Sequence, residues 1–478
     1  MSRYNKFGFY KNKYSVGQLS GYTNTYPKYP SLPDSTKFFE FMRGGFTRNS
    51  APVANVDVVS IAPLNNRNTL IYNNGFLLPD GNVAFHSYGA PIGGNTTISK
   101  YNAETNSFSI VSTSFPVSGD LYKSGTMCRD SKFRLYIGDQ SSLKYNRVLE
   151  VNTTTLAITE KSVPAYDSTS KQINLYSPTQ LDYTLWHKNL LAPKLTNNFS
   201  NINIGYFWIH DLNANTFTRT SAVYDGRTSV QLPQADNVNM VQHPVNGNVY
   251  IIPGEGFVRN GERSSGINPN GYDPRVIVEY NPFTDTTRRF TPNGANLSVN
   301  NPTQIGQLNA YTESLFGSTA LGVDGNIYCF PGVCRTDILA FNPVSNTSVQ
   351  GTFNIFSNTG SNTIVTYGAI TAPDGYIYAK ARGVQTARFS GEQDFWLAID
   401  TNPTSATYRQ GTCIPVDPLG INTNLGSGKQ TSIVMSKNGL IMGQPNTTEF
   451  MATLQTYGNG GYFVSHHPSL NMNSCVIN

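Results

Sequence analysis

A short phrase built around Asp-Gly recurs through most of this 478-residue chain, and it limits the possible folds more than any other feature. "DGNIYCFPG", from Asp324, is its clearest copy. Asp-Gly signals a tight turn because Asp tolerates left-handed backbone angles and Gly adopts them without a Cβ clash. The β-forming residues that follow predict a short strand, which Pro331 ends because proline cannot donate to a strand ladder. Related phrases lie near residues 80, 131, 187, 246, 374 and 438, about 60 residues apart.

A second phrase follows the first and predicts a strand, a turn containing Asn or Asp, and another strand. In "ILAFNPVSNTSVQ", from Ile338, Asn342 can bond its own backbone and Pro343 pre-sets the φ angle of the second turn position. Similar phrases begin at Ile98, Val148, Phe207, Val276 and Trp396. The two phrases together make one unit of four strands in up-and-down order.

Seven such units predict an all-β fold, a seven-bladed β-propeller of four-stranded antiparallel blades, because propellers typically set 4–8 blades round a central channel. A β-solenoid would need shorter and more regular repeats, and a pair of β-sandwiches would not repeat seven times. Closing the ring removes an exposed edge. Two segments are candidates for the closing strand: "NVDVVSI", from Asn55 to Ile61, and "GYFVSHH", from Gly461.

The repeated phrases resemble those of kelch-like and gluconolactonase-like propellers, in which a "DG-x-[IV]-Y" hairpin precedes a strand and an "[FY]-[DN]-P-x-[TS]" turn. The resemblance covers roughly residues 65–465. It implies the propeller fold and no activity, since the paired-Gly and Tyr/Trp signature of kelch repeats is absent, as is the sialidase Asp-box. We therefore carry over no functional residue from these families.

The first 50 residues do not match the repeat, so we expect two parts: an extended N-terminal arm over 1–50 and a propeller over 51–478. The arm carries eight Lys or Arg and two Asp or Glu, whereas the rest of the chain holds 26 basic and 27 acidic residues. The arm also contains 12 Tyr and Phe. Pro and Gly at short intervals, with no steady period of hydrophobic residues, argue against a compact domain there.

The aromatic residues of the arm need a surface to cover them, because exposed aromatic groups are normally buried against something. The arm either wraps back on its own propeller or lies along another subunit, with its Lys and Arg meeting an acidic surface. We expect the second arrangement, and nucleic-acid binding is a weaker alternative because a charge of +6 over fifty residues is a weak signal. The candidate partner-binding residues are Tyr4, Lys6, Phe7, Phe9, Tyr10, Lys11, Lys13, Tyr14, Tyr22 and Tyr26.

The loops between units divide into two groups. If the strands run outward from the channel, the Asp-Gly and Asn-Pro turns share one face and the long variable loops share the other. Function tends to lie on variable loops held by a rigid scaffold. The longest run from Pro253 to Arg275 and from Lys380 to Asp394. They are either solvated loops with surface ion pairs or a contact surface for a partner or glycan. The candidate contact residues are Arg259, Arg263, Arg382 and Arg388.

Motifs for catalysis are sparse, so we expect no catalytic residue, no metal site and no cofactor. The six His lack metal-ligand spacing, and the adjacent His466 and His467 would point to opposite faces of a strand. No nucleophile elbow, phosphate loop or dinucleotide fingerprint is present. Asp and Glu are too dispersed to nominate the carboxylate pair of a glycosidase. The five Cys are scattered and predict reduced thiols.

The composition is similar to that of phage and virus particle proteins: lightly charged, rich in Asn, Thr and Tyr, with an adhesive arm. We expect a non-enzymatic structural or attachment component of a virion, made in the host cytoplasm because no signal peptide is visible. Its partners would be other proteins of the assembly and a host receptor or glycan, with no membrane partner because no apolar stretch approaches about 18 residues. The alternatives are a propeller interaction module of a cellular protein and a propeller hydrolase or lyase acting on carbohydrate, and fold alone does not decide among them.

Overall fold

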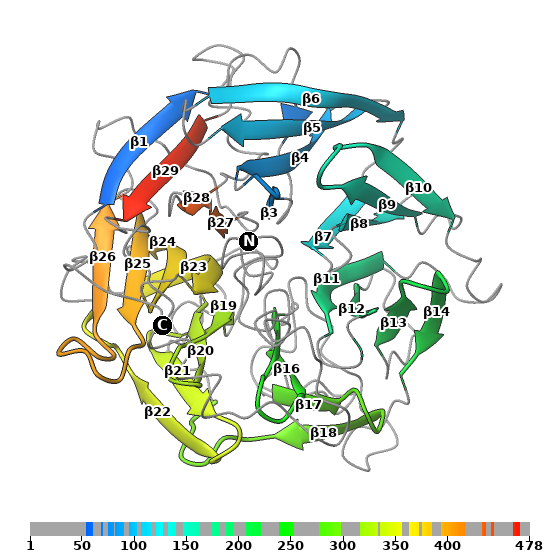
Figure 1. The fold of residues 1–478 in the computed structure, drawn as a ribbon. Coiled ribbons are helices and arrows are strands. Elements are labelled where there is room, and N and C mark those ends of the chain that lie inside the picture. Colours follow the sequence, from blue (N-terminus) through cyan, green and yellow to red (C-terminus); the bar gives the residue numbers. More distant parts are fainter. Residues whose placement is uncertain are drawn as a thin grey trace, which may run out of the picture.

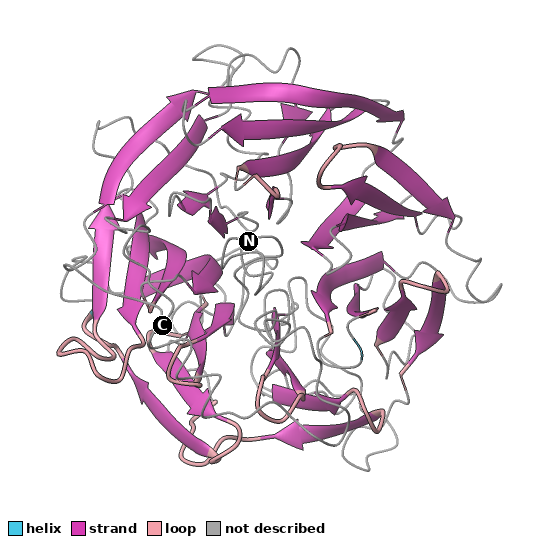
Figure 2. Ribbon diagram, in the orientation of Figure 1, coloured by secondary structure: helices cyan, strands magenta, loops and turns pink. Residues whose placement is uncertain are grey.

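A computed structural model gives the fold of the parts of the chain between Ala54 and Pro468 that can be described. All regular elements within them are strands, so the fold is all-β, as predicted (Figure 2). None of these residues forms a helix long and apolar enough to cross a membrane. The described residues are 54–60, 68–69, 75–80, 82–89, 95–102, 107–116, 121–127, 132–139, 147–162, 174–181, 185, 187–194, 207–220, 239–252, 277–297, 316–332, 335–355, 363–371, 375–384, 393–415, 433–435, 441–443 and 462–468.

The described strands pair into seven antiparallel sheets, each built from consecutive strands except where the two chain ends meet. The first three sheets consist of β2 (Asn68–Thr69), β3 (Gly75–Leu77), β4 (Val83–Gly89), β5 (Asn95–Asn102) and β6 (Ser107–Pro116); β7 (Leu121–Met127), β8 (Lys132–Asp139), β9 (Arg147–Asn152) and β10 (Ile158–Ser162); and β11 (Asn174–Gln180), β12 (Lys188–Lys194), β13 (Trp208–Asp211) and β14 (Thr216–Arg219). The next three consist of β15 (Asn239–Gln242), β16 (Val249–Ile252), β17 (Ile277–Asn281) and β18 (Thr286–Phe290); β19 (Phe316–Leu321), β20 (Ile327–Pro331), β21 (Ile338–Asn342) and β22 (Thr347–Gly351); and β23 (Thr363–Thr371), β24 (Tyr376–Val384), β25 (Gln393–Asp400) and β26 (Gly411–Pro415). The last consists of β27 (Ile433–Met435), β28 (Ile441–Gly443), β29 (Tyr462–Pro468) and β1 (Ala54–Ser60).

The sheets follow one another around a common centre in chain order (Figure 1). In the sheets whose first strands are labelled, such as those that begin with β7, β11, β19 and β23, the first strand lies nearest the centre and the last lies at the rim. Neighbouring first strands touch, since β7 contacts β11, β11 contacts β15, β15 contacts β19, β19 contacts β23, β23 contacts β27 and β27 contacts β3. All seven predicted first turns fall between the first and second strands of a sheet.

The last sheet joins the two ends of the described chain. β29 pairs with β28 on one side and with β1 on the other, and Ala54 lies opposite Pro468. The sequence offered the two end segments as alternatives for the closing strand, and the structure uses both, β29 as the third strand and β1 as the fourth. The reason is that the last unit has no second hairpin phrase of its own.

The turn residues behave as the repeat predicts. Gly247, Gly325 and Gly375 have φ angles of 71°, 79° and 83°, in the left-handed region that favours glycine. In the second turn, Asn342 Oδ1 accepts hydrogen bonds from the backbone N–H of Val344 at 2.9 Å and of Ser345 at 3.2 Å. These bonds explain why an Asn or Asp recurs where the third strand ends.

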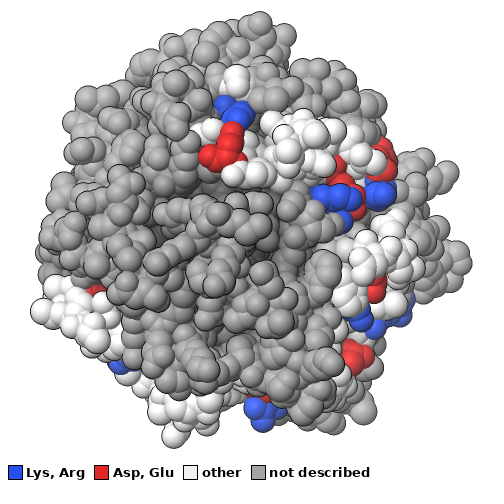
Figure 3. Space-filling view, viewed as in Figure 1, with Lys and Arg blue, Asp and Glu red and all other residues white. Residues whose placement is uncertain are grey.

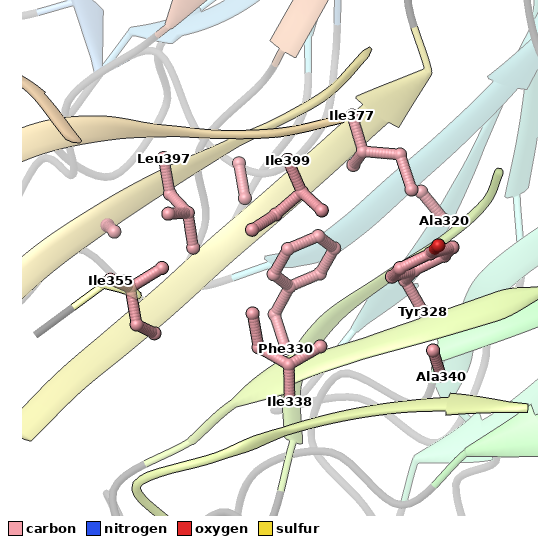
Figure 4. Close-up of a cluster of buried hydrophobic side chains, with 11 residues drawn as sticks. Ala320, Tyr328, Phe330, Ile338, Ala340, Ile355, Ile377, Leu397 and Ile399 are labelled. Atoms are coloured by element: carbon pink, nitrogen blue, oxygen red, sulfur yellow. The ribbon is translucent and has the colours of Figure 1, made fainter. Parts of the chain in front are cut away.

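The hydrophobic core lies between neighbouring sheets. Figure 4 shows the cluster where the β19–β22 sheet faces the β23–β26 sheet. Phe330 and Ile338 come from one sheet and Ile377 and Leu397 from the other, and all four are fully buried. Where the core is described, sheets therefore bury apolar side chains against a neighbouring sheet rather than against a separate layer of helices.

Candidate functional site

One turn departs from the repeat and brings polar side chains of two sheets together. Residues 401–410 connect β25 to β26, whereas residues 282–285 and 343–346 make the same connection in two other sheets. The longer turn contacts the Asp-Gly turn of the neighbouring β19–β22 sheet. We call this polar contact the Asp324 cluster, and it consists of Asp324, Asn326, Tyr328, Tyr408 and Arg409.

Asp324 is the acceptor at the centre of the cluster, and its side chain is only 3% exposed. Its Oδ1 accepts from the Asn326 backbone N–H at 3.0 Å. Its Oδ2 accepts from the Asn326 Nδ2 at 2.5 Å and from the Tyr328 and Tyr408 hydroxyls, each at 2.8 Å. Because each carboxylate oxygen has two lone pairs, Oδ2 is already filled. Asp324 is thus placed as a structural acceptor, not as a general base.

The two tyrosines act as fixed donors. Burial, with Asp324 beside it, raises the pKa of Tyr328 well above its usual range. Burial and the same carboxylate raise the pKa of Tyr408 to about 12. Both hydroxyls therefore stay protonated at neutral pH, and each holds its proton toward Asp324.

Arg409 closes the cluster on its exposed side. Its side chain is 25% exposed, and its guanidinium carbon lies 4.8 Å from the centre of the Tyr408 ring. Its Nη2 is 3.9 Å from Asp324 Oδ2, which is beyond hydrogen-bond length. Its Nε is buried and has no hydrogen-bond partner among the described residues. The φ angle of 58° matches the left-handed residue that ends the equivalent turns, such as Asn346 at 53°.

Backbone-directed bonds tie the turns of three successive sheets together on the same face. The Thr401 hydroxyl accepts from the Val323 N–H at 3.1 Å and donates to the Gly375 carbonyl at 2.6 Å. His243 Nδ1 accepts from the Val245 N–H at 3.3 Å, so Nε2 carries the proton that reaches the Gly325 carbonyl at 3.0 Å. First and second turns therefore lie together among the described residues, as predicted.

Other sheets build the first turn with the same chemistry and different residues. Asp80 accepts from the backbone N–H and the Nδ2 of Asn82, each at 3.0 Å, and from Lys100 Nζ at 2.6 Å. Lys100 lies opposite Ala84, the position that Tyr328 occupies in the β19–β22 sheet. Ala84 thus leaves room for Lys100 on the neighbouring strand. The donor to the turn carboxylate can therefore come from the second strand, as Tyr328 does, or from the third, as Lys100 does.

The β15–β18 sheet moves the negative charge from the turn to the third strand. Asn246 stands at the turn position and donates from Nδ2 to the Tyr250 hydroxyl at 2.9 Å. That hydroxyl donates to Glu279 at 2.7 Å, and Arg288 Nε donates to the same carboxylate at 2.6 Å. The recurring phrase therefore keeps the turn and the buried polar chain while the residue that carries the charge changes.

The described residues offer little for covalent or metal chemistry. No three His, Cys, Asp or Glu among them lie close enough to hold a metal ion. Cys329 is fully buried, and burial raises the pKa of its thiol. On the face in Figure 3, the described Lys and Arg lie beside Asp and Glu and form no patch of one sign.

No protein-family model matches the chain. No curated protein matches it either. What the chain does must therefore be argued from its own residues.

The predicted contact residues lie mostly outside the described residues. This holds for all ten arm residues from Tyr4 to Tyr26 and for Arg259, Arg263 and Arg388. Arg382 was expected in a loop from Lys380 to Asp394, and that expectation was wrong. It lies in β24, opposite Val365 on β23 and Asp394 on β25, because both neighbouring strands extend far enough to pair with it. The Asp324 cluster was not predicted, although the unusual length of the turn at 401–410 was a signal for it.

Replacing Asp324 with asparagine is expected to destabilise the protein by about 3 kcal/mol, because an amide nitrogen would face donors and leave buried groups without an acceptor. Asp80→Asn is the matched control, since the same exchange is made at the same turn position. The Asp80 side chain is 47% exposed, so the Asp80→Asn variant should lose less than about 1 kcal/mol of its free energy of unfolding. Chemical denaturation of both variants measures the difference, and equal losses would contradict the structural role of Asp324.

Proposed function

We propose that this chain is a non-enzymatic structural or attachment protein of a virion, built as a seven-bladed β-propeller and anchored by its N-terminal arm. Each blade is one of the seven antiparallel sheets. Three observations support this fold: the chain order of the sheets, the contacts between neighbouring first strands, and the pairing of β1 with β29.

The observation that carries the functional proposal is the place where the arm joins the fold. β1 is the outermost strand of the last sheet, and Ala54, its first residue, lies opposite Pro468. β29 runs like the third strand of the other sheets, so its end lies on the face that carries the Asp324 cluster. The basic, aromatic arm is therefore attached directly to the strand that fastens the ring.

The opposite face is then free to meet the host. We call the face that carries the first and second turns and the Asp324 cluster the turn face. Anchoring there leaves the longer connections of the opposite face pointing away from the particle, and function tends to lie on such connections. We assign contact with a host receptor or glycan to this face, with Arg259, Arg263 and Arg388 as the residues to replace first; Arg382 is left out because it lies within β24. Replacing all three with alanine should abolish that contact and leave assembly unchanged.

Deleting the arm is expected to remove the chain from its assembly. Cells making either the full chain or a chain that starts at Ala51 are lysed, and large assemblies are separated on a density gradient. Quantitative mass spectrometry should find the full chain in one assembly at a fixed ratio to its most abundant protein. The shortened chain should fall by at least about tenfold in that fraction, because the aromatic anchors supply most of the binding energy.

Folding of the shortened chain is the control. It keeps β1, so its thermal unfolding should match that of the full chain. Equal incorporation of both chains would overturn the anchoring role of the arm. Recovery of the full chain as a free monomer would instead support an interaction module of a cellular protein.

A further inference from the structure

Arginines elsewhere in the described chain hold a carboxylate with two nitrogens. A guanidinium is planar, and its parallel N–H groups match the two oxygens of a carboxylate, so such pairs are short. Two of these arginines reach both oxygens, Arg288 with Glu279 at 2.6 and 3.1 Å and Arg335 with Asp337 at 2.9 and 3.1 Å. Arg134 directs both nitrogens to one oxygen, Glu150 Oε1, at 2.9 and 3.0 Å.

Arg409 is held differently. The nearest carboxylate oxygen among the described residues is Asp324 Oδ2 at 3.9 Å, and that oxygen is already filled by two tyrosine hydroxyls and an amide. The ring of Tyr408 supports the guanidinium from one side at 4.8 Å. A quarter of the side chain reaches solvent. The guanidinium is thus fixed in place, partly desolvated, and has no carboxylate at hydrogen-bond distance in this part of the chain.

We propose that Arg409 is the centre of a binding site for the carboxylate group of an acidic sugar. The two terminal nitrogens of the guanidinium donate to the carboxylate; the internal pairs instead use Nε with Nη2, and Nε of Arg409 is buried. This site lies on the turn face, apart from the contact residues assigned to the opposite face, and it concerns the chain before it is anchored in a particle.

The local charge selects the ligand. Asp324 and Asp400 lie buried near the turn and repel any anion, a doubly charged phosphate more than a singly charged carboxylate, so the single positive charge of Arg409 favours the carboxylate of the two. Apart from Pro403 and Ala406, the rest of the extended turn is made of neutral hydroxyl and amide side chains. Thr404 Oγ1 donates to Asn402 Oδ1 at 2.8 Å, and both side chains reach solvent. Hydroxyl groups that both donate and accept complement the hydroxyls of a sugar ring.

Saturation-transfer NMR on the full chain tests the site with three probes. Glucuronate carries the carboxylate, glucuronamide replaces it with a neutral amide on the same ring, and sulfate is a plain dianion. Glucuronate should bind with a Kd in the millimolar range, and glucuronamide should bind at least about tenfold more weakly because the charge-assisted fork is lost. Sulfate should not displace glucuronate at equal concentration.

Variants place the binding at Arg409. Arg409→Gln should abolish the glucuronate signal, and Arg409→Lys, which keeps the charge and loses the fork, should weaken binding about tenfold. Arg219→Gln, at an exposed position on β14, is the matched control and should bind as the natural chain does. Equal binding of glucuronate and glucuronamide by the natural chain would overturn the proposal even if the Arg409 variants failed to fold. Displacement by sulfate would overturn the sugar assignment, and unchanged binding by folded Arg409→Gln would overturn the site.

Discussion

Replacing Gly317 with alanine should destabilise the protein by about 3 kcal/mol or more, which is a large share of the stability of a typical protein. A Cβ at this position would lie 2.0 Å from the Thr366 carbonyl oxygen and 2.8 Å from its Oγ1. Neither atom can move freely, because the Thr366 hydroxyl donates to the Pro331 carbonyl at 3.0 Å and accepts from Ser318 at the same distance. The methyl group would force β19 away from β23, where two sheets meet.

Gly351→Ala is the control for the Gly317 variant. A Cβ there would meet nothing within 4 Å, so the change should alter stability by no more than about 0.5 kcal/mol. Urea unfolding of both variants gives the comparison. Similar losses in the two would mean that β19 and β23 do not approach as closely as the structure shows.

Acid is expected to weaken the fold between pH 6.5 and 4 through two buried histidines. Burial lowers the pKa of His210 and of His243 from 6.5 to about 4. As the pH falls through 6.5, the unfolded chain takes up a proton on each imidazole, while the folded chain does not until about pH 4. The stability that the neutral side chains contribute is therefore complete above pH 6.5 and is lost toward pH 4, by roughly 3 kcal/mol for each histidine at pH 4.

The surroundings of the two histidines explain why the neutral form is held. The Tyr136 hydroxyl, which accepts from Asn189 at 2.7 Å, donates to His210 Nδ1 at 2.8 Å, and His210 Nε2 donates to Asn215 at 3.1 Å. Among nearby charges, Arg134 lowers the pKa of His210, whereas Glu150 and Asp211 raise it. Protonation of Nδ1 would place a new N–H against a hydrogen-bond donor in both cases. The donor is the Tyr136 hydroxyl at His210 and the Val245 N–H at His243.

His243→Gln separates the contribution of one histidine, because glutamine can still donate to Gly325 and does not titrate. Urea unfolding midpoints are measured at pH 7.5, 6, 5 and 4 for the variant and the natural chain. The decrease in the midpoint across that range should be about half as large in the variant. If the urea midpoint of the variant depended on pH as steeply as that of the natural chain, His243 would not be the titrating group. No slope between pH 6.5 and 4.5 in the natural chain would show that neither imidazole is held neutral.

The strand order followed from the sequence because each turn is specified locally. Asp324 with Gly325, and Asn342 with Pro343, fix their turns through their own backbone angles and through bonds to neighbours two or three residues away. Such signals are visible in a single line of sequence. The all-β class was therefore predictable, and so was the position of every first turn.

The Asp324 cluster was not predictable, because its partners are set by how one sheet meets the next. Tyr408 is 84 residues from Asp324 in the chain and belongs to another sheet. The same limit applies to Ala84, whose small size matters only because Lys100 lies opposite it. The closing strand was undecided for a related reason, since β1 and β29 are local strands whose pairing joins opposite ends of the chain.

The pairing of Ala54 with Pro468 also determines how the β1–β29 ladder responds to mechanical load. A force applied between the segment before Ala54 and the segment after Pro468 acts on the same end of the β1–β29 ladder. The seven residue pairs of that ladder would then open one after another, like a zipper, and not all together in shear. Ser60 and Tyr462, at the far end of the ladder, would part last. The β1–β29 ladder would therefore be weakest when the segments before Ala54 and after Pro468 are pulled together, and a load applied through only one of these segments would not unzip it.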